Sequence, residues 1–340
     1  MGILMMENKI LCVNNTPIDS GIGKYALNME KLGFEVVSII SQKDKLNRNY
    51  TNNKIYGIYP PFMSGWTINS EIINILLKLK SKNSNRYYHY LTPMNTRFHN
   101  KNNIITFHDL YFMHRKSFEE RYFYYLYKKL IKTKQNNLIT VSKNTMNEMI
   151  DFGFNENNIT VIYPYIDDKI FFKISNIEKE NFVLTVGDGI FKNNIYICDL
   201  LHKNNIKHIH IGKEVKLNHY GNNRYITNIS ENQMNEYYNK ANLVIRASKY
   251  EGFGYPIIES IFAGTNVLTS DINTFKEFLS YKYYNDIYSD NFINKINDLM
   301  NHNIDNDFRN KIINMFSQKK FFDKIIYYYN GLIWLINPLL

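Results

Sequence analysis

Short apolar runs that end in Gly, Asn or Asp alternate along this chain with amphipathic stretches of about 10 to 18 residues. The run Asn103 to Phe107 and the helical stretch Phe118 to Thr133 form one such pair. A strand followed by a helix is the unit that builds a parallel sheet covered by helices. The alternation therefore predicts the α/β fold class.

Two series of these units are expected, each forming a doubly wound domain. The predicted strands of the first half are Lys9 to Asn14, Phe34 to Ile40, Lys54 to Tyr59, Arg86 to Tyr90, Asn103 to Phe107, Leu138 to Val141 and Ile159 to Tyr163. Its predicted helices include Gly23 to Leu32, Ser70 to Lys80, Phe118 to Thr133 and Lys143 to Phe152, the last capped by Ser142. The predicted strands of the second half are Phe182 to Val186, Lys207 to Ile211, Arg224 to Thr227, Leu243 to Arg246 and Asn266 to Thr269. A helix from Glu231 to Lys240 opens there with the capping-box pattern Ser230-x-x-Gln233.

The length of 340 residues exceeds what one hydrophobic core usually fills, so two domains are expected. A polar stretch from Asp167 to Glu180 separates the two series and is the predicted linker. We therefore expect an N-terminal domain at residues 1–166 and a C-terminal domain at residues 167–316. The remaining residues, 317–340, contain a predicted helix from Ser317 to Ile336 that is long enough to cross back and pack on the first domain.

Composition limits the environment and the partners of the chain. No apolar stretch reaches the roughly 20 residues that span a bilayer, and the start has no basic region followed by a long apolar run. Only Cys12 and Cys198 occur, one in each half, which suits a reducing compartment and argues against a disulfide framework. We expect a cytoplasmic protein. The formal net charge of +10 favours an anionic partner, whether a phosphorylated substrate, an acidic membrane surface or nucleic acid.

The strongest local signal is the segment Leu243 to Gly264, which contains Glu251-Gly-Phe-Gly-Tyr-Pro-Ile-Ile-Glu259. It predicts a strand, a Gly-containing loop and a helix that starts near Pro256. Gly252 and Gly254 let the backbone approach a ligand closely, and the free N–H groups of a helix N-terminus attract phosphate. Both carboxylates can face one pocket, where they would accept hydrogen bonds from hydroxyl groups. From the chemistry alone, a Gly-rich turn with two surface acids is the alternative.

The same segment closely resembles the E-x7-E motif of retaining GT-B glycosyltransferases, especially glycosyltransferase family 4, whose Tyr-Glu-Gly-Phe-Gly-x-Pro core is intact here. The resemblance implies two Rossmann-like domains that face each other across a cleft, with a nucleotide-sugar bound to the second. It covers most of the chain, from about residue 10 to about residue 280.

A second segment, Thr185 to Asn193, resembles the family's Val-Gly segment that ends in Arg-Lys-Asn and contacts the donor diphosphate. Gly187 and Lys192 match that segment, whereas Phe191 stands where the arginine is usual. Arg246 and Lys249 are candidates for the missing charge; each is also compatible with a solvated cation.

A third segment, Ile104 to Leu110, places His108 and Asp109 just after a buried strand. An isolated histidine is more often a structural group than a catalyst. The pair resembles the family's His-Asp-Leu segment, and by that resemblance His108 faces the transferred sugar across the cleft.

The segment Ser20 to Ala26 contains the form Gly-x-Gly-x-x-Ala, which is the dinucleotide fingerprint. About six residues separate the preceding strand from Gly21, whereas the fingerprint needs its first glycine at the strand-to-helix turn itself. The oxidoreductase interpretation therefore fails. In the family that this chain resembles, a loop of this kind lines the cleft near the donor phosphates, which assigns Gly21 and Gly23 to the site.

Three other patterns are weaker. Asp305-Asn-Asp307 has the D-x-D form of metal-dependent transferases but lies in a polar turn, where we interpret it as a helix cap. His208 and His210 share one face of a strand without further metal ligands nearby in sequence, so no metal site is expected. The basic, aromatic helix from Glu119 to Lys132 is compatible with a core face or with peripheral contact with an anionic membrane.

The resemblance implies transfer of a sugar from a UDP- or GDP-linked donor to an acceptor hydroxyl with retention, without a metal or other cofactor. The acceptor would be a glycan, a lipid-linked molecule or a protein, and no nucleic-acid partner is expected. The catalytic candidates are His108, Glu251 and Lys192. The donor-binding candidates are Gly21, Gly23, Gly187, Lys192, Arg246, Glu251, Gly252, Phe253, Gly254, Tyr255 and Glu259. A sugar phosphorylase of the same fold, and a basic binding protein on a degenerate transferase scaffold, are the alternatives.

Overall fold

The chain divides into two compact units, Met1–Tyr163 and Pro164–Leu340, in a computed structural model. The structure describes residues 10–14, 16, 20–41, 54–59, 87–93, 103–114, 118–132, 137–212 and 221–336. The helix predicted at Ser70 to Lys80 lies outside these residues. The boundary between the units falls three residues before the expected end of the first domain at residue 166.

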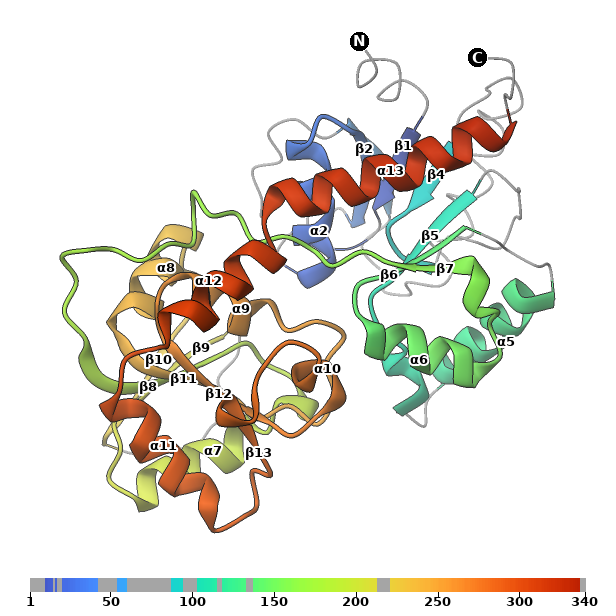
Figure 1. Cartoon of the computed structure of the whole chain (residues 1–340). Coiled ribbons are helices and arrows are strands. Elements are labelled where there is room, and N and C mark those ends of the chain that lie inside the picture. Colours follow the sequence, from blue (N-terminus) through green and yellow to red (C-terminus); the bar gives the residue numbers. More distant parts are fainter. Residues whose placement is uncertain are drawn as a thin grey trace. The chain divides into compact units, whose positions relative to one another are not determined.

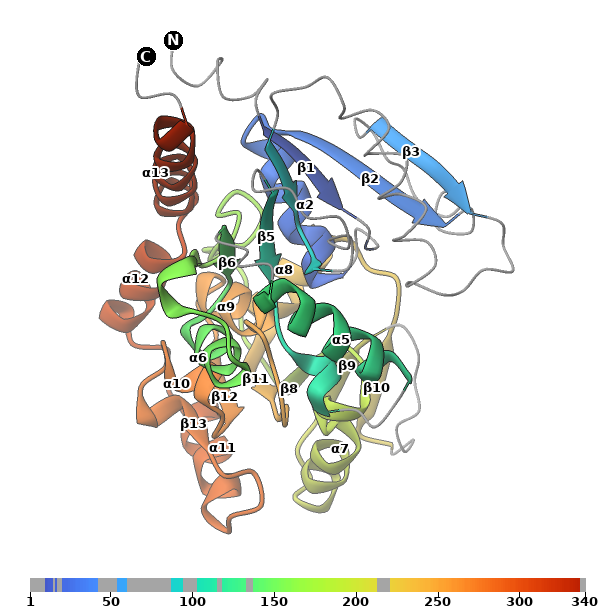
Figure 2. The ribbon, with the colours of Figure 1, turned by 90° about the vertical axis from the view of Figure 1, so that its right-hand side faces the viewer.

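The described part of the first unit holds a parallel sheet in the order β3-β2-β1-β4-β5-β6-β7, whose first strands run side by side in Figure 2. Its strands are β1 (Ile10–Asn14), β2 (Glu35–Ser41), β3 (Lys54–Tyr59), β4 (Tyr87–Tyr90), β5 (Asn103–Phe107), β6 (Leu138–Thr140) and β7 (Ile159–Val161). Its longer helices are α2 (Gly21–Lys31), α5 (Phe118–Lys132) and α6 (Lys143–Phe152).

Helices α5 and α6 lie side by side and cover β5 and β6 (Figure 1). Their buried faces form one apolar cluster that includes Leu126, Leu130, Met149 and Phe152. The expected cap is present, because the Ser142 side chain accepts from the N–H of Thr145 at the start of α6. The local signals for this helix therefore predicted both its ends.

The described part of the second unit holds a parallel sheet in the order β10-β9-β8-β11-β12-β13. Its strands are β8 (Glu180–Val186), β9 (His208–Ile211), β10 (Asn223–Ile226), β11 (Ala241–Arg246), β12 (Asn266–Ser270) and β13 (Tyr284–Asn285). Its helices are α7 (Asn194–Lys203), α8 (Glu231–Lys240), α9 (Tyr255–Phe262), α10 (Asn273–Lys276), α11 (Asn291–Asn301), α12 (Asn306–Met315) and α13 (Gln318–Ile336). Helices α8, α9 and α12 lie on one face of the sheet and α7 and α11 on the other (Figure 1).

Both parallel sheets confirm the α/β prediction, and the capping box of Ser230 and Gln233 starts α8 where expected. Strand ends differ from the predictions by at most two residues, for example at Val161, where β7 ends. Helix α2 begins at Gly21, two residues before its predicted start. The packing of α13 on the first domain stays a prediction.

The stretch expected to be a linker, residues 167–180, is instead bound to its own unit. The N–H groups of Phe172 and Ile174 donate to the side-chain oxygens of Asn235 and Asn239 on α8, at 3.2 and 2.8 Å. The Asn239 amide returns a bond to the carbonyl of Phe172 at 2.9 Å, and Phe171 is buried. The linker prediction was therefore wrong, because two buried asparagines satisfy the backbone of a stretch that has little apolar content.

Candidate functional site

The loop between β11 and α9 has a backbone shape that requires glycine. Gly254 caps α9 with a φ of 95°, in the left-handed region, and Pro256 lies in the first helical turn. A Cβ atom on Gly254 would lie 2.7 Å from Cε1 of Phe275. Both the backbone angle and the space therefore restrict this position to glycine.

Three side chains, those of Arg246, Lys192 and Ser248, meet at the Glu251 carboxylate, and the four residues are called here the Glu251 cluster. One carboxylate oxygen, Oε1, accepts from Arg246 Nε at 2.6 Å, from Lys192 Nζ at 2.6 Å and from Ser248 Oγ at 2.7 Å. Glu251 is buried, and burial acts to raise the pKa of its carboxyl. Arg246 and Lys192 outweigh that effect and hold the pKa at about 2, so the carboxylate is ionised at neutral pH.

The cluster joins the ends of two adjacent strands, β8 and β11. Arg246 Nη1 donates to the carbonyl of Val186, and a Cβ on Gly187 would lie 3.4 Å from this nitrogen. The loop after β8 is held to the loop after β11 by the Lys249 N–H, which donates to the Phe191 carbonyl at 2.7 Å. Ligands of open α/β sheets bind at such carboxyl ends, where the strand order reverses.

The sequence analysis named Arg246 as a candidate for the cation missing at Phe191, and the structure places it beside Lys192. It is 6% exposed and points at the same carboxylate as Lys192. Lys249 is exposed, and its backbone N–H holds the loop that carries Phe191. The structure thus brings Gly187, Lys192, Arg246 and Glu251 together.

Glu259 takes a different partner from Glu251. It is the fifth residue of α9 and is 2% exposed. Its Oε2 accepts from the Tyr238 hydroxyl of α8 at 2.9 Å. Glu259 therefore lies about one turn into α9, inside the unit.

In the first unit, His108 lies directly after β5 and contacts helix α2. Its Nε2 lies 3.0 Å from the Leu91 carbonyl, and its ring packs edge-on against Tyr25 with centroids 5.1 Å apart. Because a carbonyl can only accept, Nε2 carries the proton. Burial lowers the pKa of His108 to about 4, so the imidazole is neutral at pH 7 with an acceptor at Nδ1.

The Gly21 to Gly23 segment forms the first turn of α2, two residues before Tyr25. The Ser20 side chain caps this turn by accepting from the Gly23 N–H at 2.9 Å. Tyr25 therefore connects the glycine turn to His108 within one unit. That these residues share a site with Glu251 stays a prediction.

Asp305 and the two histidines of β9 each have a hydrogen-bond partner within the second unit. Asp305 caps α12 by accepting from the Phe308 N–H at 2.7 Å, as expected. His208 and His210 both lie 2.8 Å from the Thr185 hydroxyl. Within the described ranges, no three His, Cys, Asp or Glu side chains gather as a metal site would require. In the same ranges, no helix has the length and apolar character needed to cross a membrane.

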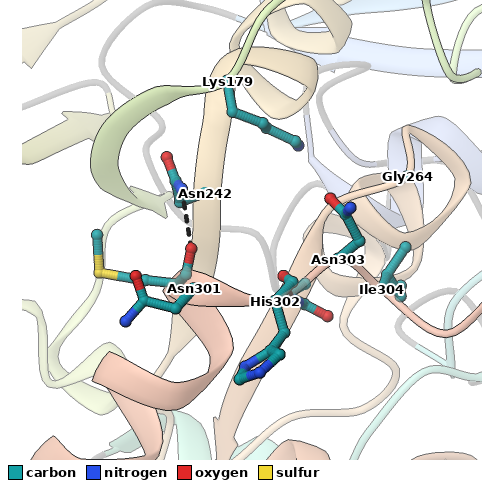
Figure 3. Close-up of a pocket in the computed structure, with 9 residues that line it drawn as sticks. Lys179, Asn242, Gly264, Asn301, His302, Asn303 and Ile304 are labelled. Carbon is teal, nitrogen blue, oxygen red and sulfur yellow. Dashed lines mark hydrogen bonds between the residues drawn. The ribbon is translucent and has the colours of Figure 1, made fainter.

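A separate cavity of about 190 Å³ lies at the amino ends of strands of the second sheet (Figure 3). Lys179 and Asn242 line it; Asn242 donates to the Met300 carbonyl at 2.9 Å, and Lys179 donates to the Ala241 carbonyl at 2.8 Å. Burial lowers the pKa of Lys179 to about 8. Asn242 and Asn266 stand at the amino ends of β11 and β12, so this cavity is distinct from the Glu251 cluster.

Sequence reasoning did not single out Ser248 or Tyr238. Ser248 stands three residues before Glu251, a spacing at which side chains meet within a turn, so a local signal existed. Tyr238 lies 21 residues before Glu259 on another helix, and no local pattern connects them.

Two family models match consecutive parts of the chain. The family described as glycosyl transferases group 1 matches residues 167–315, and glycosyltransferase family 4 matches residues 24–169. The O-antigen chain mannosyltransferase RfbU of Salmonella typhimurium is 26% identical over 275 residues, which cover 74% of this chain and 72% of RfbU.

Solved structures show the same fold at low identity. Sucrose-phosphate synthase from Thermosynechococcus elongatus matches with a TM-score of 0.73 and 12% identity, covering 95% of this chain and 98% of that protein. HepE of Anabaena, in complex with UDP and glucose, matches with a TM-score of 0.67 and 12% identity, covering 94% and 98%. WaaG, a glycosyltransferase involved in lipopolysaccharide biosynthesis, matches with a TM-score of 0.66 and 13% identity, covering 90% and 94%.

Proposed function

Because this chain belongs to the GT-B glycosyltransferases of the family 4-like group, we propose that it transfers a sugar from a UDP- or GDP-linked donor to an acceptor hydroxyl. The observation that carries the proposal is the convergence of Arg246 and Lys192 on Glu251 at the ends of β8 and β11. Two cations and one ionised carboxylate suit a ligand that combines a diphosphate with hydroxyl groups. HepE, which shares the fold, is known in complex with UDP-glucose.

In this proposal, protein charge stabilises the leaving diphosphate and no metal is needed. Lys192 and Arg246 supply the positive charge, and the N–H groups at Gly254 and Tyr255 lie at the N-terminus of α9, beside Phe253 and Gly252. Such a terminus carries a partial positive charge that favours phosphate. Electrostatic groups fixed before the reaction stabilise developing charge most effectively.

Glu251 would hold hydroxyl groups of the transferred sugar, and Glu259 those of the ribose. We propose retention by a front-side route, in which the bond from the anomeric carbon to the phosphate oxygen breaks while the acceptor oxygen bonds to the same face. The leaving phosphate takes the acceptor proton. His108, neutral and with an acceptor at Nδ1, would orient the sugar from the first domain.

We propose glycan or glycoconjugate synthesis as the process, supported by the similarity to an O-antigen chain mannosyltransferase. The acceptor would be a glycan, a lipid-linked molecule or a protein.

We also propose a cytoplasmic location with peripheral contact with anionic membranes. Tyr124 and Tyr125 on α5 are 52% and 66% exposed, and Lys128 lies over the Tyr124 ring. Flotation with phosphatidylglycerol vesicles would be lost in a Tyr124→Ser, Tyr125→Ser variant.

The test is release of UDP or GDP from a panel of sugar nucleotides in the presence of acceptor alcohols. Wild-type protein should release the diphosphate, and Glu251→Ala should abolish the release. Glu236→Ala is the matched control, because Glu236 is an exposed acid on α8 that pairs with Lys240. Unchanged turnover in Glu251→Ala would refute the assignment.

Three further measurements separate the finer claims. Consumption of the sugar by inorganic phosphate in place of an alcohol would identify a phosphorylase. Nuclear magnetic resonance of the product shows whether the anomeric configuration is retained. Turnover that disappears with EDTA would contradict metal independence.

A further inference from the structure

In the second unit, contacts of hydrogen-bond length connect a row of polar side chains on β8 and β9. The row ends at the carboxyl end of β8. His208 Nε2 and His210 Nδ1 each lie 2.8 Å from the Thr185 hydroxyl oxygen. His210 Nε2 lies 3.2 Å from Oδ1 of Asp188, which follows β8. Thr185, His208 and His210 are each at most 1% exposed, whereas the Asp188 side chain is 32% exposed. The buried chain thus leads to one acid near the surface.

The protons of this chain can be assigned from its end. The Asp188 carboxylate can only accept, so His210 carries its proton on Nε2. Burial lowers the pKa of both histidines, that of His208 to about 3, so each is neutral and has one N–H. Thr185 therefore donates to His210 Nδ1 and accepts from His208 Nε2, whereas Nδ1 of His208 has no hydrogen-bond partner among the described residues. This assignment satisfies all three contacts of the chain and makes His210 the donor to Asp188.

The absence of a side chain at Gly212 leaves space for the Asp188 carboxylate beside β9. A Cβ on Gly212, which follows β9, would lie 2.5 Å from both carboxylate oxygens of Asp188 and 2.7 Å from His210 Nε2. Any other residue at position 212 would displace the pair. Asp188 is therefore held in the crevice between the ends of β8 and β9.

Asp188 lies next to the proposed donor site. Asp188 is two residues after Val186, whose carbonyl binds Arg246. In the strand order β9-β8-β11, Asp188 stands on the β9 side of β8 and Arg246 on the β11 side. The two carboxylates, Asp188 and Glu251, therefore flank the end of β8, where the donor would lie.

We propose that Asp188 is a further specificity-determining residue, whose carboxylate accepts a hydrogen bond from a hydroxyl group of the transferred sugar. His210 and Thr185 are positioning residues that act through it. The inference rests on the proposed glycosyltransferase function. A carboxylate beside a diphosphate repels it, so Asp188 disfavours a free nucleoside diphosphate and favours a ligand that also presents a hydroxyl group. This makes discrimination between the two ligands the expected role.

The experiment compares the affinities of the full-length wild-type and Asp188→Asn proteins by isothermal titration calorimetry. The probes are UDP, GDP, UDP-glucose, UDP-N-acetylglucosamine and GDP-mannose. Asp188→Asn should weaken binding of the preferred sugar nucleotide about tenfold or more, because a hydrogen bond to a charged group is lost. Binding of the corresponding free diphosphate should stay equal or become tighter. Asp298→Asn, which makes the same charge change on the exposed face of α11, should alter neither affinity.

The positioning role is tested at His210. His210→Gln keeps an N–H that can donate to Asp188 and should retain most of the discrimination, whereas His210→Leu should lose it. Equal weakening of both ligands in Asp188→Asn, or no change in either, would overturn the inference while leaving the proposed function intact. A wild-type protein that binds none of the five probes would overturn both.

Discussion

The ion pair between Arg246 and Glu251 gives a quantitative prediction for a double-mutant cycle. Glu251 has an ordinary carboxyl pKa of 4.5 that falls to about 2 in the folded protein. At about 1.4 kcal/mol per pKa unit, this shift corresponds to about 3 kcal/mol of stabilisation. Because the pKa is lower in the folded state, the stabilisation is complete above about pH 4.5 and is lost as the pH falls toward 2.

Glu251→Gln should therefore lower the free energy of unfolding at pH 7 by about 3 kcal/mol, since it leaves the Arg246 guanidinium, 6% exposed, without its carboxylate. Arg246→Met alone leaves the carboxylate with Lys192 and Ser248. The double variant removes both buried charges. It should lose less stability than the sum of the single losses, by about 1 to 3 kcal/mol. Transfer activity should stay lost, because the hydroxyl-binding group is gone.

The assay is urea unfolding of the four proteins at pH 7 and at pH 3, followed by circular dichroism. The deficit of Glu251→Gln should shrink at pH 3, where part of the wild-type stabilisation has disappeared. Single losses that add to within about 0.5 kcal/mol in the double variant would show that the two side chains are not coupled. That result would refute the ion pair as the reason for the low pKa.

Three further predictions concern the backbone and the buried groups. Gly254→Ala should lower the melting temperature and weaken donor binding. Adding Phe275→Leu removes the clash but should rescue only part of the loss, because the φ of 95° remains. Full rescue would contradict the strain argument. Acidification from about pH 6.5 to pH 4 should destabilise the protein. The pKa of His108 is about 4 in the folded protein, so in this range the histidine binds a proton in the unfolded chain but not in the folded one. A His108→Gln variant whose melting temperature falls as steeply with decreasing pH as that of the wild type would contradict this. Asn239→Ala should lower the free energy of unfolding by about 2 kcal/mol, since it removes the side-chain hydrogen bonds to the backbone of Phe172 and Ile174. An unchanged urea midpoint would show that Asn239 does not hold residues 167–180 to α8.

Features with local causes could be predicted from the sequence. Ser142 caps α6 and the Ser230–Gln233 box starts α8, because each cap joins residues three apart. The loop around Gly254 was also predictable, since a strand, a glycine and a proline in this order specify how a helix begins. Helices such as α11 were missed, although their apolar residues follow a helical period.

Contacts between distant residues could not be predicted, and the site depends on them. The sequence made Arg246 a candidate cation, but nothing local indicates that it shares the Glu251 carboxylate with Lys192, which lies 59 residues before Glu251. The same holds for the stretch that α8 binds through Asn235 and Asn239, 63 and 65 residues from their partners.

The sequence alone determined the α/β class, the helix caps and the presence of the Glu251 to Glu259 loop. The tertiary structure decided which cations neutralise Glu251, where Glu259 lies, and that Asp188 and His210 form a pair. The physical reason is that a cap forms within one turn of chain, whereas the carboxyl ends of parallel strands meet only after long crossover connections have folded.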